Sequence, residues 1–268
     1  MPRACLLIRP DVRARWQAFQ AGLGRCGFSV QIEVSVPNES DVLVIWNRHR
    51  YSGQARQFEN AGARVIVAEN GWLNAASAEK QIALQLGHHN GAGTWYEGPE
   101  DRWSLLGIDL KPWRSDGDHV LVLAQRGIGE PGISQPRGWA ESISSELRSR
   151  TNRQVIIRRH PGNHEPPLEP DWTRCWAAVT WASGAGIKAL IAGVPVFYGF
   201  EKWIGAAAAM PVWAGIEKPF LGDRLPMLRR LSWAQWSLPE ISTGEPFARL
   251  LGEGHRPGRS TPEIQAAQ

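Results

Sequence analysis

The chain has 268 residues, a formal net charge of +4 at pH 7 and a sequence pI near 9.2. Hydrophobic residues make up 43% of it, which is enough to build the cores of two small domains. No segment approaches the ~20 apolar residues of a membrane-spanning helix. The N-terminus, interrupted by Arg9 and Pro10, does not have the pattern of a signal peptide.

The three cysteines, Cys5, Cys26 and Cys175, stand far apart and form no Cys-x-x-Cys pair. This spacing argues against a disulfide framework or a zinc site, and it favours a protein of the reducing cytoplasm. The adjacent His88 and His89 have no acidic or thiol partner at ligand spacing, so we expect no bound metal. The basic pI permits a polyanionic partner without requiring one, and the sequence does not indicate an oligomeric state.

The N-terminal part of the chain alternates predicted strands and helices. Gly27 and Gly62 follow the two helical patterns, as glycine often does at the end of a helix. The predicted strands span residues 4–8, 29–34, 41–46 and 64–68, and the predicted helices span residues 12–26 and 53–61. Apart from Asp41 at its start, the run at 41–46 is continuously apolar, which indicates a strand that is buried on both faces.

A second alternating unit begins near residue 119. Residues 97–118 are rich in Pro, Gly, Asp and Arg, and we interpret them as the region that links two domains. The unit after them has predicted strands at 120–124, 155–157, 177–180 and 194–197, and predicted helices at 139–150 and 187–192. The chain then becomes helical and rich in tryptophan. We therefore expect an α/β protein with two domains, residues 1–117 and 118–268.

Basic and small residues stand at the ends of two predicted strands in the second unit. The predicted strand at 155–157 is followed by Arg158, Arg159 and His160. The predicted strand at 177–180 is followed by a helix that opens with the run Ser183-Gly184-Ala185-Gly186. Ligands bind at the carboxyl ends of strands in parallel α/β sheets. The backbone N–H groups and the dipole of a helix N-terminus favour phosphate there. The sequence therefore predicts an anion site in this unit.

Three short motifs follow one another along the chain. Glu69-Asn70-Gly71 ends a strand of the first unit, His160-Pro161 ends one in the second, and Thr180 with Ser183 comes next. Together they resemble the motifs of GT-B glycosyltransferases, in particular the bacterial sialyltransferase-like and capsule (Kdo) transferase group. One position departs from that group, which usually has two acidic residues before the glycine, because the second of them is an asparagine here.

The resemblance implies a GT-B fold, in which two Rossmann-like domains face each other across a cleft and C-terminal helices cross back to the first domain. It also implies a metal-independent transfer of a sugar from a nucleotide-sugar, for example a UDP-sugar, to an acceptor hydroxyl. The nucleotide-sugar is a co-substrate, and no other cofactor is implied. The first domain would hold the acceptor and the second the donor. Small phage DNA glycosyltransferases share this fold.

Two residues are the predicted catalytic groups. By the resemblance, Glu69 is the general base that takes the proton of the acceptor hydroxyl, and His160 contacts the phosphate of the leaving nucleotide. The alternatives are a helix cap or a loop ion pair for Glu69, and an ordinary surface histidine for His160.

The predicted binding residues divide between the two domains. In the second, glycines would let the backbone approach a phosphate, and basic side chains would neutralise it. The predicted donor-binding residues are Gln125, Arg126, Gly127, Gly129, Arg158, Thr180, Ser183, Gly184, Gly186 and Lys188. The predicted acceptor-binding residues are Asn70, Trp72, His89 and Asn90. Ordinary turns and solvated surface groups are the alternative interpretation of both sets.

These patterns leave two classes of acceptor open. The basic pI and the lack of a membrane anchor favour 5-hydroxymethylcytosine in phage-type duplex DNA, with arginines on the phosphates and a tryptophan in place of the extruded base. A saccharide, as in capsule and surface polysaccharide synthesis, is the alternative acceptor. A non-catalytic nucleotide- or DNA-binding module and a sugar-nucleotide epimerase are the alternative functions.

Overall fold

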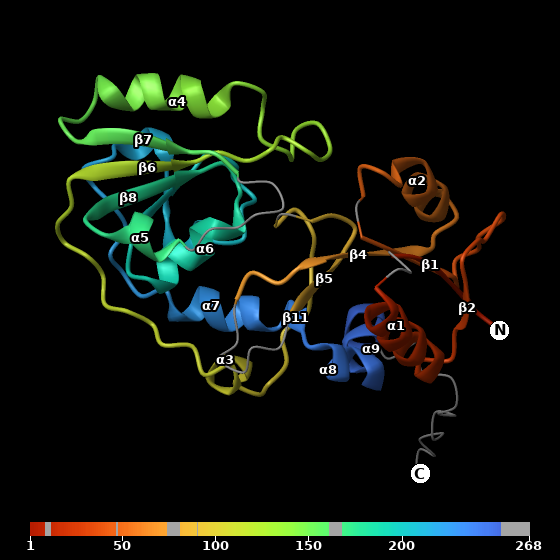
Figure 1. Ribbon diagram of the computed structural model, residues 1–268. Helices are drawn as coiled ribbons and strands as arrows, with labels where there is room; N and C mark the ends of the chain where they lie inside the picture. Colours follow the sequence, from red (N-terminus) through yellow and green to blue (C-terminus); the bar gives the residue numbers. More distant parts are fainter. Residues whose placement is uncertain (9–11, 47, 74–80, 90, 161–167, 253–268) are drawn as a thin grey trace, which may run out of the picture.

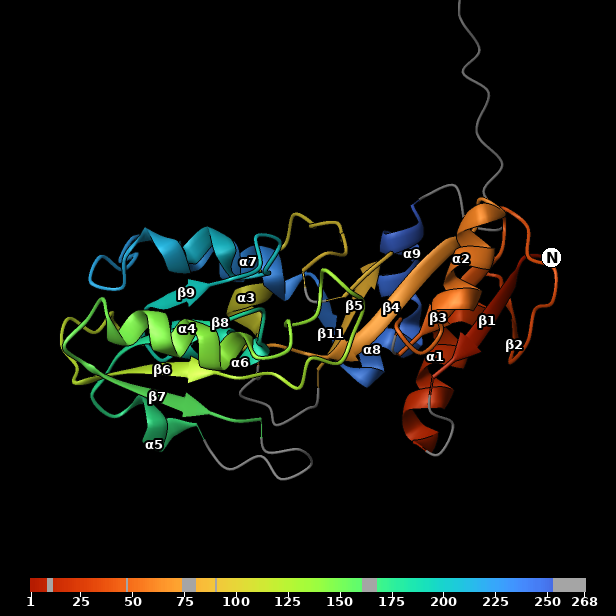
Figure 2. The same ribbon diagram turned by 90° about the horizontal axis from the view of Figure 1, so that it is seen from above.

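The computed structural model describes residues 1–8, 12–46, 48–73, 81–89, 91–160 and 168–252. Two separate β-sheets organise this part of the chain, and helices pack on both (Figure 1, Figure 2). The α/β class predicted from the alternating pattern is confirmed. Within the described residues, no helix is both long and apolar enough to cross a membrane.

The first sheet has six strands in the order β11-β5-β4-β3-β1-β2. Its strands are β1 (Arg3–Leu7), β2 (Ser29–Gln31), β3 (Val42–Ile45), β4 (Arg64–Asn70), β5 (Ile82–Leu86) and β11 (Gln235–Trp236). The first four are parallel, and β5 pairs antiparallel with both β4 and β11. Strand β3 is fully buried because α1 (Arg13–Arg25) covers one face of the sheet and α2 (Ser52–Asn60) the other. Its unbroken apolar run is therefore explained.

The second sheet has five parallel strands in the order β10-β9-β8-β6-β7. Its strands are β6 (His119–Leu123), β7 (Gln154–Arg158), β8 (Cys175–Thr180), β9 (Val196–Tyr198) and β10 (Met210–Pro211). Helix α4 (Trp139–Arg148) packs on one face with Val120 and Val122, and α6 (Gly184–Ile191) on the other with Leu121 and Leu123. There are also two short helices, α3 (Arg102–Leu105) and α5 (Glu169–Trp172), and Trp172 belongs to the same hydrophobic cluster as Leu121 and Leu123.

The C-terminal elements return to the first sheet, as the resemblance implied. After α7 (Leu225–Ser232), strand β11 pairs with β5 in the register Gln235↔Ala83. Helices α8 (Leu238–Thr243) and α9 (Glu245–Leu251) then pack on α1. The approach is close, because a Cβ atom added to Gly22 of α1 would lie 2.1 Å from the Ile241 carbonyl oxygen of α8.

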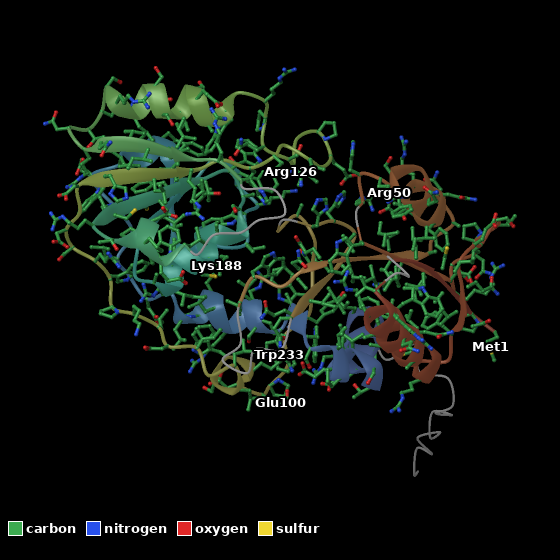
Figure 3. The ribbon with its side chains drawn as sticks, viewed as in Figure 1. Met1, Arg50, Glu100, Arg126, Lys188 and Trp233 are labelled. Atoms are coloured by element: carbon green, nitrogen blue, oxygen red, sulfur yellow. The ribbon has the colours of Figure 1, made fainter. Side chains whose placement is uncertain are left out.

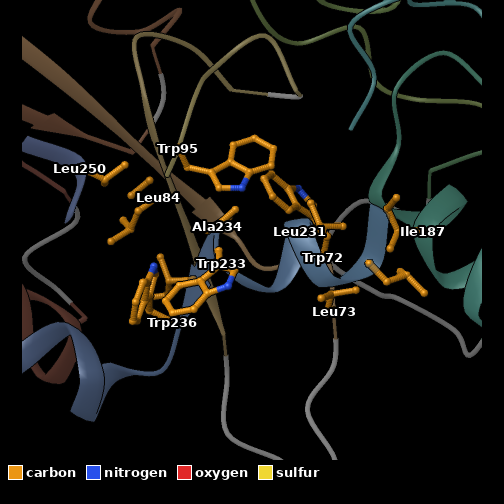
Figure 4. Packing of buried hydrophobic residues seen from close by; sticks show 14 of the residues in the cluster. Trp72, Leu73, Leu84, Trp95, Ile187, Leu231, Trp233, Ala234, Trp236 and Leu250 are labelled. Atoms are coloured by element: carbon orange, nitrogen blue, oxygen red, sulfur yellow. The ribbon is translucent and has the colours of Figure 1, made fainter. Parts of the chain in front are cut away.

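One hydrophobic cluster runs through both halves of the molecule. Trp72 follows β4 in the first half, and it lies near Ile187 of α6 and Leu231 of α7 (Figure 4). All three side chains are at least 95% buried. The two sheets are therefore joined by continuous packing as well as by the chain itself. The division at residues 117 and 118 stays a prediction.

Several element boundaries differ from those predicted, and two of these differences bear on the candidate site residues. Strand β4 continues through Glu69 and Asn70, where the prediction ended it at residue 68, because β5 pairs alongside these two residues. Helix α6 begins at Gly184, three residues before the predicted start, because Ser183 caps it. Glu69 therefore lies within a strand and not in the loop after it.

Candidate functional site

The carboxyl ends of β4 and β8 meet between the two sheets. Trp72 follows β4, and Gly184 begins the helix that follows β8. A Cβ atom on Gly184 would lie 3.3 Å from Cδ1 of Trp72, so the two segments are in contact. Ligands of open α/β sheets bind at this kind of edge, which makes it the candidate site. Trp72 is only 5% exposed and belongs to the core here, whereas the sequence predicted an acceptor contact.

Thr180 and Ser183 shape the turn between β8 and α6. The Ser183 backbone N–H donates to Thr180 Oγ1 over 2.9 Å, and the Ala185 N–H donates to Ser183 Oγ over 3.1 Å. Thr180 is completely buried, so its hydroxyl accepts this hydrogen bond on the interior side of the turn. The first turn of α6 thereby points its backbone N–H groups and its positive dipole end toward the edge of the sheet.

Gln125 ties the loop after β6 to the loop after β8. Its side-chain Oε1 accepts the Ala182 backbone N–H over 2.8 Å, and its own backbone N–H donates to Gln135 Oε1 over 2.9 Å. In the same loop, Gly127 and Gly129 have φ angles of +66° and +150°, which side-chain-bearing residues rarely adopt. The predicted donor residues after β6 are therefore partly framework residues of the site.

Four basic residues were predicted near the donor, and their surroundings differ. Within the described part of the chain, neither the exposed side chain of Arg126 nor the half-buried side chain of Lys188 makes a hydrogen bond or an ion pair. Figure 3 shows Arg126 on the loop after β6 and Lys188 on α6. Arg158, in contrast, forms an ion pair with Asp171 of α5. His160 is exposed after β7. Arg126 and Lys188 are thus two predicted donor contacts whose charge has no ion-pair partner among the described residues.

Glu69 lies in the first half of the molecule, on β4. Its side chain is half-buried, and Oε1 accepts a hydrogen bond from Nε2 of Gln85 on β5 at 2.8 Å. Neighbouring residues of a strand point to opposite faces, and Asn70 is exposed. Asn90, predicted at the acceptor, and Pro161 of the histidine motif lie outside the described residues.

The side chain of Glu130, in the second half of the chain, contacts two residues of the first half. Its Oε1 accepts a hydrogen bond from Arg48 Nε at 3.1 Å, and its Oε2 lies 2.8 Å from His88 Nδ1. Burial alone would raise the pKa of the Glu130 carboxyl, but the His88 hydrogen bond and the Arg48 charge outweigh it and lower the pKa below its usual value. No local pattern predicts this contact, because Arg48 and His88 lie 82 and 42 residues from Glu130 along the chain.

His89 lies beside this contact. Burial lowers the pKa of its imidazole, and Glu130 opposes that shift only partly. Its Nδ1 atom is buried and has no hydrogen-bond partner among the described residues. The neutral ring is therefore favoured at neutral pH. In the described residues, no group of three or more His, Cys, Asp or Glu side chains could hold a metal ion.

The solved structures that resemble most of this fold include two Kdo transferases. The β-Kdo 2,7-transferase of Thermosulfurimonas dismutans KpsC matches 91% of this chain and 98% of its own, with a TM-score of 0.59 and 13% identity. The β-Kdo 2,4-transferase of the same KpsC matches 87% of this chain and 90% of its own, with a TM-score of 0.53 and 13% identity.

Sequence comparison adds no family. No family model matches the chain, and no curated protein is significantly similar to it. The two structural likenesses, at 13% identity, show the fold alone. This protein therefore has the two-domain, GT-B-like α/β fold that its motifs implied.

Proposed function

We propose that this protein is a glycosyltransferase that moves a sugar from a nucleotide-sugar to a hydroxyl group of a saccharide. One observation carries the proposal: the strand that bears Glu69 ends against the Ser183-capped start of α6, where Trp72 meets Gly184. The segments that carry a carboxylate and a helix start suited to anion binding thus meet at one edge, which supports the proposal. The whole-length likeness to two transferases supports the same function.

In this reaction, Glu69 and the start of α6 have different roles. Glu69 takes the proton of the acceptor hydroxyl as that oxygen forms a bond to the anomeric carbon of the donor sugar. The bond between the anomeric carbon and the phosphate oxygen breaks, and the nucleotide leaves with the electron pair. The N–H groups of α6, with Lys188 and Arg126, bind the phosphate and stabilise its growing charge. His160 is proposed as a further phosphate contact.

The acceptor in this proposal is the saccharide alternative. Both of these similar structures are Kdo transferases, which supports a saccharide over hydroxymethylcytosine in DNA. Arg48, which belongs to an arginine-rich stretch of the sequence, is 5% exposed and bonded to Glu59 and Glu130. It is thus not presented to a phosphate backbone.

The test combines a panel of donors with two kinds of acceptor. Purified protein is incubated with CMP-, UDP- and GDP-linked sugars, and with either oligosaccharides or hydroxymethylated DNA. Mass spectrometry then identifies saccharide products and modified nucleosides. Transfer to an oligosaccharide supports the proposal, and transfer to DNA alone overturns the acceptor. Turnover of no donor, although a nucleotide binds, would indicate the non-catalytic module.

A further inference from the structure

Gln85 is a buried amide in a strand that is otherwise apolar. The strand β5 reads Ile82-Ala83-Leu84-Gln85-Leu86, and Gln85 is completely buried. A buried amide is unfavourable unless its hydrogen-bonding groups find partners. Gln85 Oε1 has no partner among the described residues, and Gln85 Nε2 donates to Glu69 Oε1 at 2.8 Å. The polar contact that accounts for this glutamine is therefore the one to Glu69.

Strand register places the two side chains together. In the antiparallel pair of β4 and β5, Val67 lies opposite Gln85, and Glu69 lies opposite Ala83. Glu69 is two residues from Val67 and so shares a face of the sheet with it. Glu69 and Gln85 are consequently diagonal neighbours, a separation that long side chains can bridge.

Gly93 packs closely against the side chain of Gln85. A Cβ atom on Gly93 would lie 2.7 Å from Gln85 Cβ, 2.8 Å from Gln85 Oε1 and 2.2 Å from the His88 carbonyl oxygen. Backbone hydrogen bonds in both directions between Leu86 and Thr94 fix the segment that carries this glycine. The close cover leaves the Gln85 side chain little room to turn away from Glu69.

We infer that Gln85 is a positioning residue, which fixes the Glu69 carboxylate in the orientation that removes the acceptor proton. The inference rests on the proposed function. A hydrogen bond donated to a carboxylate favours its ionised form, and the ionised form is the one that acts as a base. Gln85 does not touch the reacting atoms. It acts by holding Glu69 ionised and aligned at the edge of the sheet.

The experiment replaces the amide by a hydrocarbon of similar size. In Gln85→Leu, kcat is expected to fall about ten- to a hundredfold, the range for loss of one charge-assisted hydrogen bond, with little change in donor KM. The acidic limb of the kcat–pH profile should move to higher pH, because Glu69 loses a donor to its charged form. A merely structural glutamine would lower the amount of folded enzyme and leave the profile in place.

Two controls separate positioning from packing. Gln81→Leu removes another buried glutamine from the start of the same segment, and we expect its pH profile to match that of the unmodified protein. In the background of Glu69→Gln, the change Gln85→Leu should cost little further rate, since the two residues act as one unit. An additive loss in this double variant, or an unmoved profile in Gln85→Leu, would overturn the inference.

A readout without turnover keeps the inference distinct from the proposed function. The Glu69 carboxyl carbon is followed by ¹³C NMR across pH, and its signal is assigned by its loss in Glu69→Gln. Its titration midpoint should be higher in Gln85→Leu than in the unmodified protein. If no donor in the panel turns over but this midpoint moves, the proposed function fails and the Gln85–Glu69 coupling stands. If transfer occurs and the midpoint does not move, only the inference fails.

Discussion

Glu69 is half-buried on β4, with a fixed hydrogen-bond partner in Gln85. Glu69→Gln keeps the size of the side chain and removes its basicity. We expect kcat to fall by about 10²–10⁴ while donor affinity persists, because general-base catalysis contributes on this scale. Stopped assays give kcat, and calorimetry gives the donor Kd. Glu33→Gln, at an exposed position of the first half, is the control. Full activity of Glu69→Gln would place the base elsewhere.

His160 is exposed at the end of β7. If it contacts the donor phosphate, His160→Ala should weaken the binding of a nucleoside diphosphate about tenfold or more, on the scale of a charge-assisted hydrogen bond of ~1.5–3 kcal/mol. Isothermal calorimetry measures the change. An unaltered Kd would remove His160 from the site and leave it an ordinary surface histidine.

Lys188 is the half-buried cation of α6, and it makes no ion pair with any described residue. Lys188→Met keeps most of the stem and removes the charge. The affinity for a nucleoside diphosphate should fall by a factor of about ten, and the loss should shrink as salt screens the interaction. Lys218→Met, at an exposed position in the second half, is the matched control and should bind normally.

At the scale of elements, the start of α6 depends on a glycine. A Cβ atom on Gly186 would lie 2.6 Å and 3.0 Å from two ring carbons of Trp203, which is 2% exposed, and 3.1 Å from Thr180 Cγ2. These neighbours are packed and cannot move cheaply, so Gly186→Ala should lower the free energy of unfolding by about 1–3 kcal/mol. Urea denaturation gives the difference.

A second helical glycine provides the comparison. Gly24 lies near the end of α1, and a Cβ atom there would meet nothing within 4 Å. Gly24→Ala should therefore raise the free energy of unfolding by about 0.5–1 kcal/mol, because alanine loses less backbone freedom on folding. If Gly24→Ala also lowered the free energy of unfolding, the effect of Gly186→Ala would not be specific to the close packing at the start of α6.

At the scale of the whole molecule, the contact of the two halves near Glu130 makes stability depend on pH. Burial lowers the pKa of His89 below its ordinary value of 6.5. As pH falls below about 6.5, the unfolded chain therefore binds a proton that the folded protein does not bind until lower pH. The free energy of unfolding should decrease from pH 7.5 to pH 5.5.

The histidine responsible can be identified by substitution. In His89→Gln the decrease should be smaller but not absent, because burial also lowers the pKa of His119. Urea denaturation at the two pH values measures both slopes. Equal slopes in the two proteins would show that His89 titrates alike in the folded and unfolded states.

Much of the element order was predictable, because the signals for it are local. The apolar run of β3 predicted a strand buried on both faces, and the small-residue run after Ser183 predicted a helix start. The pairing between strands could not be predicted in the same way. The extension of β4 through Glu69 depends on β5, which lies antiparallel beside it, and no property of the β4 sequence alone specifies that partner.

Local sequence patterns were sufficient to predict the α/β class, most strands and helices, and the residues at strand ends, since periodicity and caps act over a few neighbouring residues. The partners of those residues depend instead on the packing of the folded chain. Asp171 forms an ion pair with Arg158, and Glu130 contacts both Arg48 and His88. Gln85 donates a hydrogen bond to Glu69. These contacts depend on strand register and on the packing of two sheets, which bring together side chains that no local pattern connects.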